Sequence, residues 1–150
     1  MYVRTTAQNH VNGSPGNAAV GAPVVRWEKA VSDTFQQSNR FSRVSTYKVD
    51  SDLYVDATLH NHEEYSPVSA FITGFTFCII PTTAKNIFTL ETVFKDKDGK
   101  GLGRVKKSES VRTWVHLVLI VGLPFQTDTR EVVEALTRST LDEAVQRKLF

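Results

Sequence analysis

A strict alternation of apolar and polar side chains along residues 53–60 constrains the fold of this chain more than any other feature of its sequence. Leu53, Val55, Ala57 and Leu59 alternate with Tyr54, Asp56, Thr58 and His60. Side chains of period two belong to a β-strand that buries one face and leaves the other in water. The chain must therefore build a sheet with one covered face, and other segments must supply the cover.

Other segments predict the partners of this strand. Ile87–Lys95 repeats the alternation, Asp96–Lys100 has the Asp and Gly residues of a tight turn, and Leu102–Trp114 returns as the next strand. Phe41–Val49 is predicted as a further strand. A hairpin turn between consecutive strands makes their pairing antiparallel.

Two amphipathic helices are predicted to cover the sheet. The first begins near Val24 and ends near Ser38, and the second begins at Asp128, where Glu131 completes a capping-box pattern. Their apolar stripes are Val24, Trp27, Val31 and Phe35 in the first, and Val133, Leu136, Thr140, Leu141, Ala144 and Val145 in the second. The sequence thus predicts an α+β fold, an antiparallel sheet of four to five strands with two helices packed on one face.

The 150 residues are enough for one ordinary domain with its own core. Residues 1–23 are predicted to be a flexible tether, with a short edge strand near Tyr2, because residues 9–23 are rich in Asn, Gly, Pro and Ala. Residues 24–150 are predicted to be a single α+β domain. The N-terminal ten residues lack the pattern of a signal peptide, and no apolar run is long enough to span a bilayer.

The formal net charge of +2 is too small to indicate a nucleic-acid partner. The lone Cys78 lies in an apolar run and has no second cysteine with which to form an internal disulfide. His60, His62 and Glu64 share one side of the predicted strand and are candidate metal ligands, but the polar face of the strand explains them without a metal. No catalytic residues and no cofactor are predicted.

Two segments are apolar on all sides, Val68–Ile80 and Trp114–Phe125. One interpretation makes them buried connections; the other makes them an exposed patch for a membrane surface, an amphiphile or a partner protein. If they pair, the residues brought together are Phe71, Phe75, Phe77, Leu117 and Leu119. Lys106 and Lys107 belong to a basic hairpin that is either a solvated tip or a contact for acidic groups.

From residue 24 onward the sequence resembles small bacterial cell-envelope lipoproteins of poorly defined function. The likeness rests on Ser38–Val44, Asp52–Leu59, Ser69–Thr82, and the pair formed by Phe94–Gly99 and Leu123–Phe125. More distantly, the first two segments resemble the N-terminal domain of the periplasmic Tol translocation protein and transporter-auxiliary and curli-secretion lipoproteins. The resemblance implies a lipid-modified cysteine at the mature N-terminus, absent from this chain, a following tether, and a place in the periplasm or on the periplasmic face of the outer membrane. It brings no catalytic residues.

Three functional hypotheses follow. The first is a non-enzymatic envelope domain that binds another envelope component, protein or lipid. The second is a carrier or binding module for a lipid or other amphiphile, with a cavity lined by the two apolar segments. The third is a metal-dependent enzyme that uses His60, His62 and Glu64.

Overall fold

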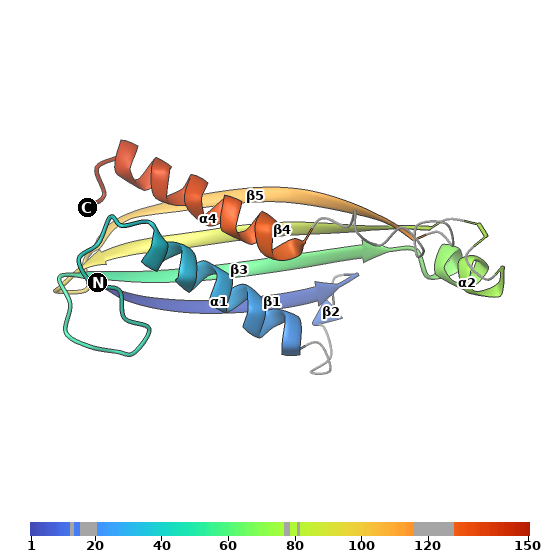
Figure 1. The fold of residues 1–150 in the computed structure, drawn as a ribbon, viewed down its shortest axis with the longest axis horizontal. Coiled ribbons are helices and arrows are strands. Elements are labelled where there is room, and N and C mark those ends of the chain that lie inside the picture. Colours follow the sequence, from blue (N-terminus) through green and yellow to red (C-terminus); the bar gives the residue numbers. More distant parts are fainter. Residues whose placement is uncertain (13, 16–20, 77–78, 81, 116–127) are drawn as a thin grey trace.

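The computed structural model describes residues 1–12, 14–15, 21–76, 79–80, 82–115 and 128–150. Within these ranges the strands are β1 (Tyr2–Val11), β2 (Ser14–Pro15), β3 (Leu53–Tyr65), β4 (Thr82–Asp96) and β5 (Gly101–Val115). The helices are α1 (Gly21–Gln37), α2 (Pro67–Phe75) and α4 (Thr129–Gln146). The strands form one sheet in the order β2-β1-β3-β4-β5, and α1 and α4 lie over the same face of it (Figure 1).

The predicted α+β class, with both long helices on one face, is confirmed. The pairs β3–β4 and β4–β5 are antiparallel, as the turn at residues 96–100 requires. The β1–β3 pair is parallel, which makes the sheet mixed. A parallel pair needs a long crossover, and α1 with the following residues 38–52 supplies it.

The N-terminal strand is longer than the sequence indicated. Tyr2–Val11 pairs with β3 over its whole length, from Tyr2 opposite Tyr54 to Val11 opposite Glu63, so β1 lies inside the sheet between β2 and β3. Residues 13 and 16–20 of the predicted tether lie outside the described residues.

The strand predicted at Phe41–Val49 is wrong. Only one isolated bridge, Tyr2 to Ser45, forms in this segment. The backbone N–H of Val3 donates to the Ser45 carbonyl at 2.9 Å, and the Ser45 N–H donates to the Met1 carbonyl at 3.0 Å. The physical reason is that the segment packs on the core instead of extending along β1: the Phe41 ring lies against those of Phe35 and Phe150, with centroids 6.4 and 4.9 Å apart.

The core lies between the sheet and the two covering helices. Trp27 of α1 packs edge-on against Phe88 of β4, with ring centroids 5.4 Å apart. The buried apolar side chains are Val3, Trp27, Ala30, Val31, Phe35, Leu53, Val55, Ala57, Leu59, Phe88, Leu90, Phe94, Val105, Val133, Leu136, Leu141 and Ala144. The alternating strands and the two helical stripes therefore share one hydrophobic interior, as predicted.

The opposite face of the sheet is polar. The Lys95 ammonium forms an ion pair with the Asp56 carboxylate at 2.6 Å, and the Arg104 guanidinium lies 3.3 Å from the Glu91 carboxylate. Each ion pair joins neighbouring strands. His60 lies on this face as well, because the odd-numbered residues of β3 from Leu53 to Asn61 are the buried ones. No described helix covers this face in Figure 1.

Candidate functional site

Helix α2 connects β3 to β4 and projects beyond the end of the sheet that lies opposite Met1 (Figure 1). Its start is specified locally: the Ser66 hydroxyl accepts from the Ser69 N–H at 3.3 Å, and Pro67 occupies a first-turn position where its missing N–H costs nothing. It ends at Phe75, and the Thr76 N–H donates to the Ile72 carbonyl at 2.9 Å. The sequence patterns did not predict this helix.

The apolar side chains of α2 form a stripe that faces outward. Val68, Phe71, Ile72 and Phe75 follow the i, i+3, i+4, i+7 spacing of an amphipathic helix, and their exposed fractions are 68, 74, 40 and 78%. The Phe71 and Phe75 rings stack, with centroids 6.4 Å apart. Ile79 and Ile80 continue the exposed apolar surface. We call these six residues the apolar tip.

The apolar tip bears on the two interpretations of Val68–Ile80. Its large apolar side chains lie in solvent, which favours the exposed patch over a buried connection. Phe77, Leu117 and Leu119 lie outside the described residues, so their predicted proximity to Phe71 and Phe75 stays a prediction.

Charged residues begin only where the tip ends. Residues 65–84 contain no Asp, Glu, Lys, Arg or His. The first charged residues on either side, Glu64 and Lys85, lie in register on neighbouring strands, and Lys85 lies directly opposite Arg112 of β5. Among the described residues neither Lys85 nor Arg112 has an ion-pair partner. A pair of adjacent bases thus follows the uncharged tip.

The candidate metal ligands do not form a group of three. His60, His62 and Glu64 lie on the open face of β3, at alternate positions of the strand. The His62 Nε2 lies 3.7 Å from a Glu64 carboxylate oxygen. Over the described ranges no three His, Cys, Asp or Glu side chains lie close enough together to hold a metal ion.

Lys106 and Lys107 point to opposite faces of β5. Lys106 lies opposite Glu91 on the open face, whereas the Lys107 ammonium lies 2.5 Å from the Glu143 carboxylate of α4. This hydrogen bond lowers the pKa of Glu143, and Arg147 lowers it further. The two lysines therefore do not form one basic patch, and Lys107 holds α4 to the sheet.

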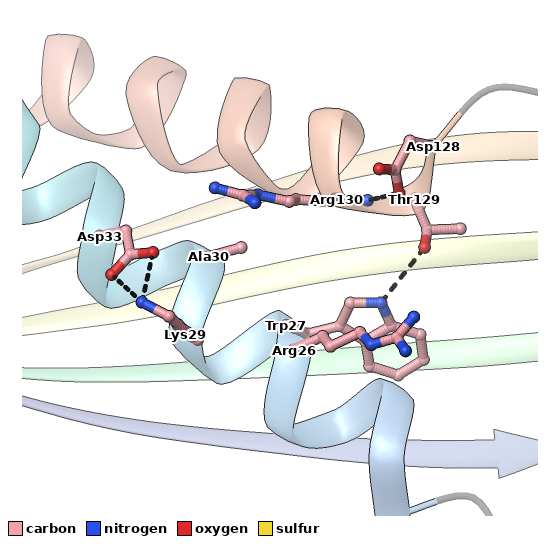
Figure 2. Close-up of a pocket in the computed structure, with 8 residues that line it drawn as sticks. All are labelled: Arg26, Trp27, Lys29, Ala30, Asp33, Asp128, Thr129 and Arg130. Carbon is pink, nitrogen blue, oxygen red and sulfur yellow. Dashed lines mark hydrogen bonds and ion pairs between the residues drawn. The ribbon is translucent and has the colours of Figure 1, made fainter.

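A groove of about 470 Å³ lies between the middle of α1 and the start of α4 (Figure 2). Its polar groups pair with each other: Lys29 with Asp33 at 2.9 Å, and the Trp27 indole N–H with the Thr129 hydroxyl at 3.5 Å. The lining residues are Arg26, Trp27, Lys29, Ala30, Asp33, Asp128, Thr129 and Arg130.

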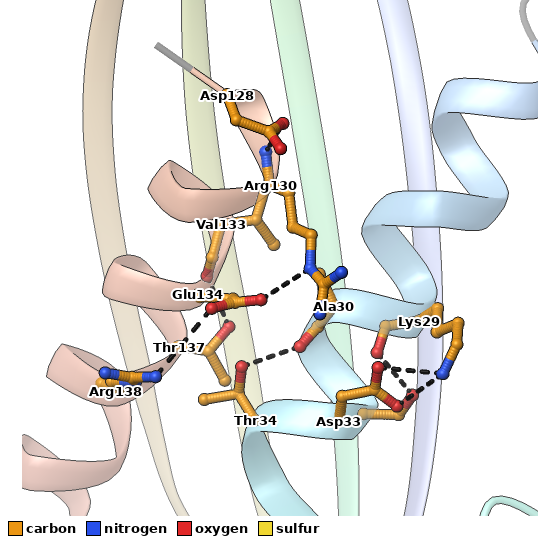
Figure 3. Close-up of polar contacts among 11 residues, drawn as sticks. Lys29, Ala30, Asp33, Thr34, Asp128, Arg130, Val133, Glu134, Thr137 and Arg138 are labelled. Carbon is orange, nitrogen blue, oxygen red and sulfur yellow. Dashed lines mark hydrogen bonds and ion pairs between the residues drawn. The ribbon is translucent and has the colours of Figure 1, made fainter. Parts of the chain in front are cut away.

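The same pairing continues along the two helices (Figure 3). Glu134 accepts from Arg130 at 2.7 Å and lies 3.9 Å from Arg138, and the hydrogen bond to Glu134 raises the pKa of Arg130. The hydroxyl of Thr34 donates to the Ala30 carbonyl within its own helix. The groove is therefore a polar seam between helices, and the apolar tip is the stronger candidate for a functional surface.

The sequence analysis proposed Phe71 and Phe75 as contact residues, which stays a prediction. It did not single out Val68, Ile72 or the two basic residues Lys85 and Arg112. The missed signal for the helix was the i, i+3, i+4, i+7 spacing of Val68, Phe71, Ile72 and Phe75. The opposition of Lys85 and Arg112 depends on strand register, which the sequence does not display.

No helix in the described part of the chain is both long and apolar enough to cross a membrane. No family model matches the chain, and no curated protein matches it. Among solved structures, a minor lipoprotein from Acinetobacter baumannii is similar at 8% identity and a TM-score of 0.41, covering 99% of this chain and 87% of the other. Lipoprotein GNA1162 from Neisseria meningitidis is similar at 12% identity and a TM-score of 0.33, covering 97% and 98%.

Both of these structures are bacterial lipoproteins, but at such identities and TM-scores neither likeness carries an argument about function. Neither is a Tol protein, so the distant resemblance to the Tol translocation protein stays a prediction.

Proposed function

We propose that this chain is a non-enzymatic domain of the bacterial cell envelope that binds another envelope component through the apolar tip. The observation that carries the proposal is the outward orientation of the α2 stripe: Phe71 and Phe75 are about three-quarters exposed, although their spacing is that of a buried helical face. An exposed apolar surface of this kind on a folded domain is typical of an interaction site.

The envelope location rests on the sequence resemblance to cell-envelope lipoproteins. As part of the proposal, a lipid anchor preceding Met1 holds the protein to the periplasmic side of a membrane. Met1 and α2 lie at opposite ends of the sheet (Figure 1), so the anchor and the apolar tip do not compete for the same surface.

The carrier hypothesis is less well supported. The cavity that it predicts involves Trp114–Phe125, most of which lies outside the described residues. The groove between α1 and α4 is a different place, and Arg26, Lys29 and Asp33 in its lining suit an amphiphile's hydrocarbon chain poorly. The enzyme hypothesis lacks a ligand set among the described residues, where His60, His62 and Glu64 do not gather into a group of three metal ligands.

Site-specific photo-crosslinking in the cells that produce the protein tests the proposal. A photoreactive residue in place of Phe75 is compared with the same residue in place of Tyr47, an aromatic side chain that is equally exposed (82% against 78%) but lies in the segment after α1. We expect adducts with an envelope component from position 75 only, and their loss when Phe71→Ser is added. Equal labelling from both positions, or none from position 75, contradicts the proposal.

A further inference from the structure

We propose that the apolar tip docks on a lipid bilayer surface that carries anionic headgroups, with the α2 stripe entering the interface and Lys85 and Arg112 contacting headgroup phosphates. This inference rests on the proposed function and names the partner of the same surface. Three features of the described residues carry it: the outward stripe, the uncharged stretch around it, and the bases behind it.

The first step concerns the distribution of charge. Twenty residues, 65–84, contain no Asp, Glu, Lys, Arg or His, although they include the exposed side chains of Val68, Phe71 and Phe75. The core of a protein–protein interface is also depleted of charged residues and enriched in aromatic ones, and a polar rim surrounds it. The interfacial zone of a bilayer instead excludes charge from the inserted part and accepts it only at the depth of the headgroups. The uncharged tip therefore fits the interfacial zone of a bilayer, and the depth and charge of the neighbouring bases favour this partner over a protein.

The second step concerns depth. Lys85 lies three residues into β4, which places it about 10 Å along the strand from Thr82. Amphipathic helices that lie in a membrane interface bury their apolar face by about 5–10 Å. When α2 is buried to that depth, the Lys85 backbone lies near the level of the phosphates, and a lysine side chain extends further toward them.

The third step concerns charge complementarity. Lys85 and Arg112 are directly opposite each other on β4 and β5, an arrangement in which like charges repel. Glu64 lies directly opposite Lys85 on its other side, so the row of three charged residues across β3, β4 and β5 carries one net positive charge. A phosphate placed between the two bases relieves their repulsion, and both belong to strands that continue directly from the tip.

Vesicle flotation with the full chain tests the inference. Vesicles of phosphatidylcholine alone are compared with vesicles that also contain phosphatidylglycerol, using the wild type and three variants: Phe71→Ser with Phe75→Ser, Lys85→Gln with Arg112→Gln, and Tyr47→Ser as a matched control for an exposed aromatic side chain. Thermal unfolding of each variant confirms that it is folded.

We expect the wild type and the Tyr47→Ser control to bind the anionic vesicles equally. Loss of the two phenylalanines reduces partitioning by about a hundredfold, because two large apolar side chains no longer enter the interface. Loss of the two bases reduces partitioning into anionic vesicles by about tenfold and leaves the weaker partitioning into phosphatidylcholine unchanged.

Three results overturn the inference. If the wild type binds neither type of vesicle while position 75 still crosslinks in cells, the partner is a protein, and the proposed function stands without the bilayer. If the tip variant binds vesicles as well as the wild type, the lipid contact lies elsewhere on the chain. Absence of both vesicle binding and crosslinking at position 75 removes the proposed function together with the inference.

Discussion

Two phenylalanine-to-alanine substitutions, at Phe88 and at Phe75, remove the same side chain from opposite environments. Phe88 is 1% exposed on β4 and packs edge-on against Trp27. Phe75 is 78% exposed on α2 and stacks only on the equally exposed Phe71 among the described aromatic rings. The pair therefore measures whether the α2 stripe contributes to the core or is free to bind a partner.

The expected losses differ severalfold. Truncating a buried phenylalanine to alanine costs about 3–5 kcal/mol of folding free energy, which lowers Tm by roughly 6–20 °C in a chain of this size. Full burial of a phenylalanine stabilises a fold by about 1.5–3 kcal/mol. Only about a fifth of the Phe75 side chain is buried, so Phe75→Ala costs about 0.5 kcal/mol, or roughly 1–2 °C.

Thermal unfolding followed by circular dichroism, repeated at several protein concentrations, checks these values. Concentration-independent transitions ensure that the fold and not an oligomer is measured. A Tm loss for Phe75→Ala as large as that for Phe88→Ala means that Phe75 is buried in the folded monomer. The tip is then part of the core, and both the proposed function and the bilayer inference fall with it.

Three further predictions concern local structure. Glu143→Gln should lower Tm at neutral pH, because the hydrogen bond from Lys107 lowers the folded-state pKa of Glu143 below its ordinary 4.5. The stabilisation by the ionised Glu143 is present above pH 4.5 and disappears as the pH falls through the lowered pKa. Below that pH the variant and the wild type should unfold alike. Asp128→Ala removes the cap that accepts from the first turn of α4 at 2.9 Å and should cost about 1 kcal/mol in denaturant unfolding, whereas Asp128→Asn should retain most of it. Gly99→Ala should cost about 1–2 kcal/mol of folding free energy, because Gly99 has a φ of 79°. Gly101→Ala is the control, since a Cβ at Gly101 has no atom within 4 Å and its φ is not positive. Equal losses for the two variants would contradict the backbone argument.

Much of the fold could be predicted because side-chain periodicity reports burial directly. The alternation from Leu53 to His60 gave the strand and its buried face, and the stripe from Val133 to Ala144 gave the helix that covers it. Pairing was harder. The ten residues of β1 carry short and polar side chains at most positions, so their place inside the sheet depends on the crossover through α1 and on the edge offered by β3.

The candidate site could be predicted only in part for the same reason. Neighbouring residues on a strand face opposite ways, so Lys106 and Lys107, adjacent in sequence, are separated by the sheet, and Lys107 pairs with Glu143. Conversely, Lys85 and Arg112 are far apart in sequence and directly opposite in space. Which charges act together is decided by register, and register follows from the long-range packing of the whole sheet.

The apolar stripes of α4 and α2 show where periodicity stops being informative. Val133, Leu136 and Leu141 are buried against the sheet, whereas Phe71 and Phe75 have comparable helical spacing and lie in solvent. A stripe predicts that one face of a helix avoids water, but it does not say what covers that face.

In α4 the opposite face bears acids and bases, as a helix at the surface of a domain requires, and the sheet supplies the cover. Residues 65–84 around α2 bear none, and the sheet ends before the helix begins. The cover for α2 must therefore come from outside the described fold, and an uncharged helix backed by two bases is suited to the surface of an anionic bilayer.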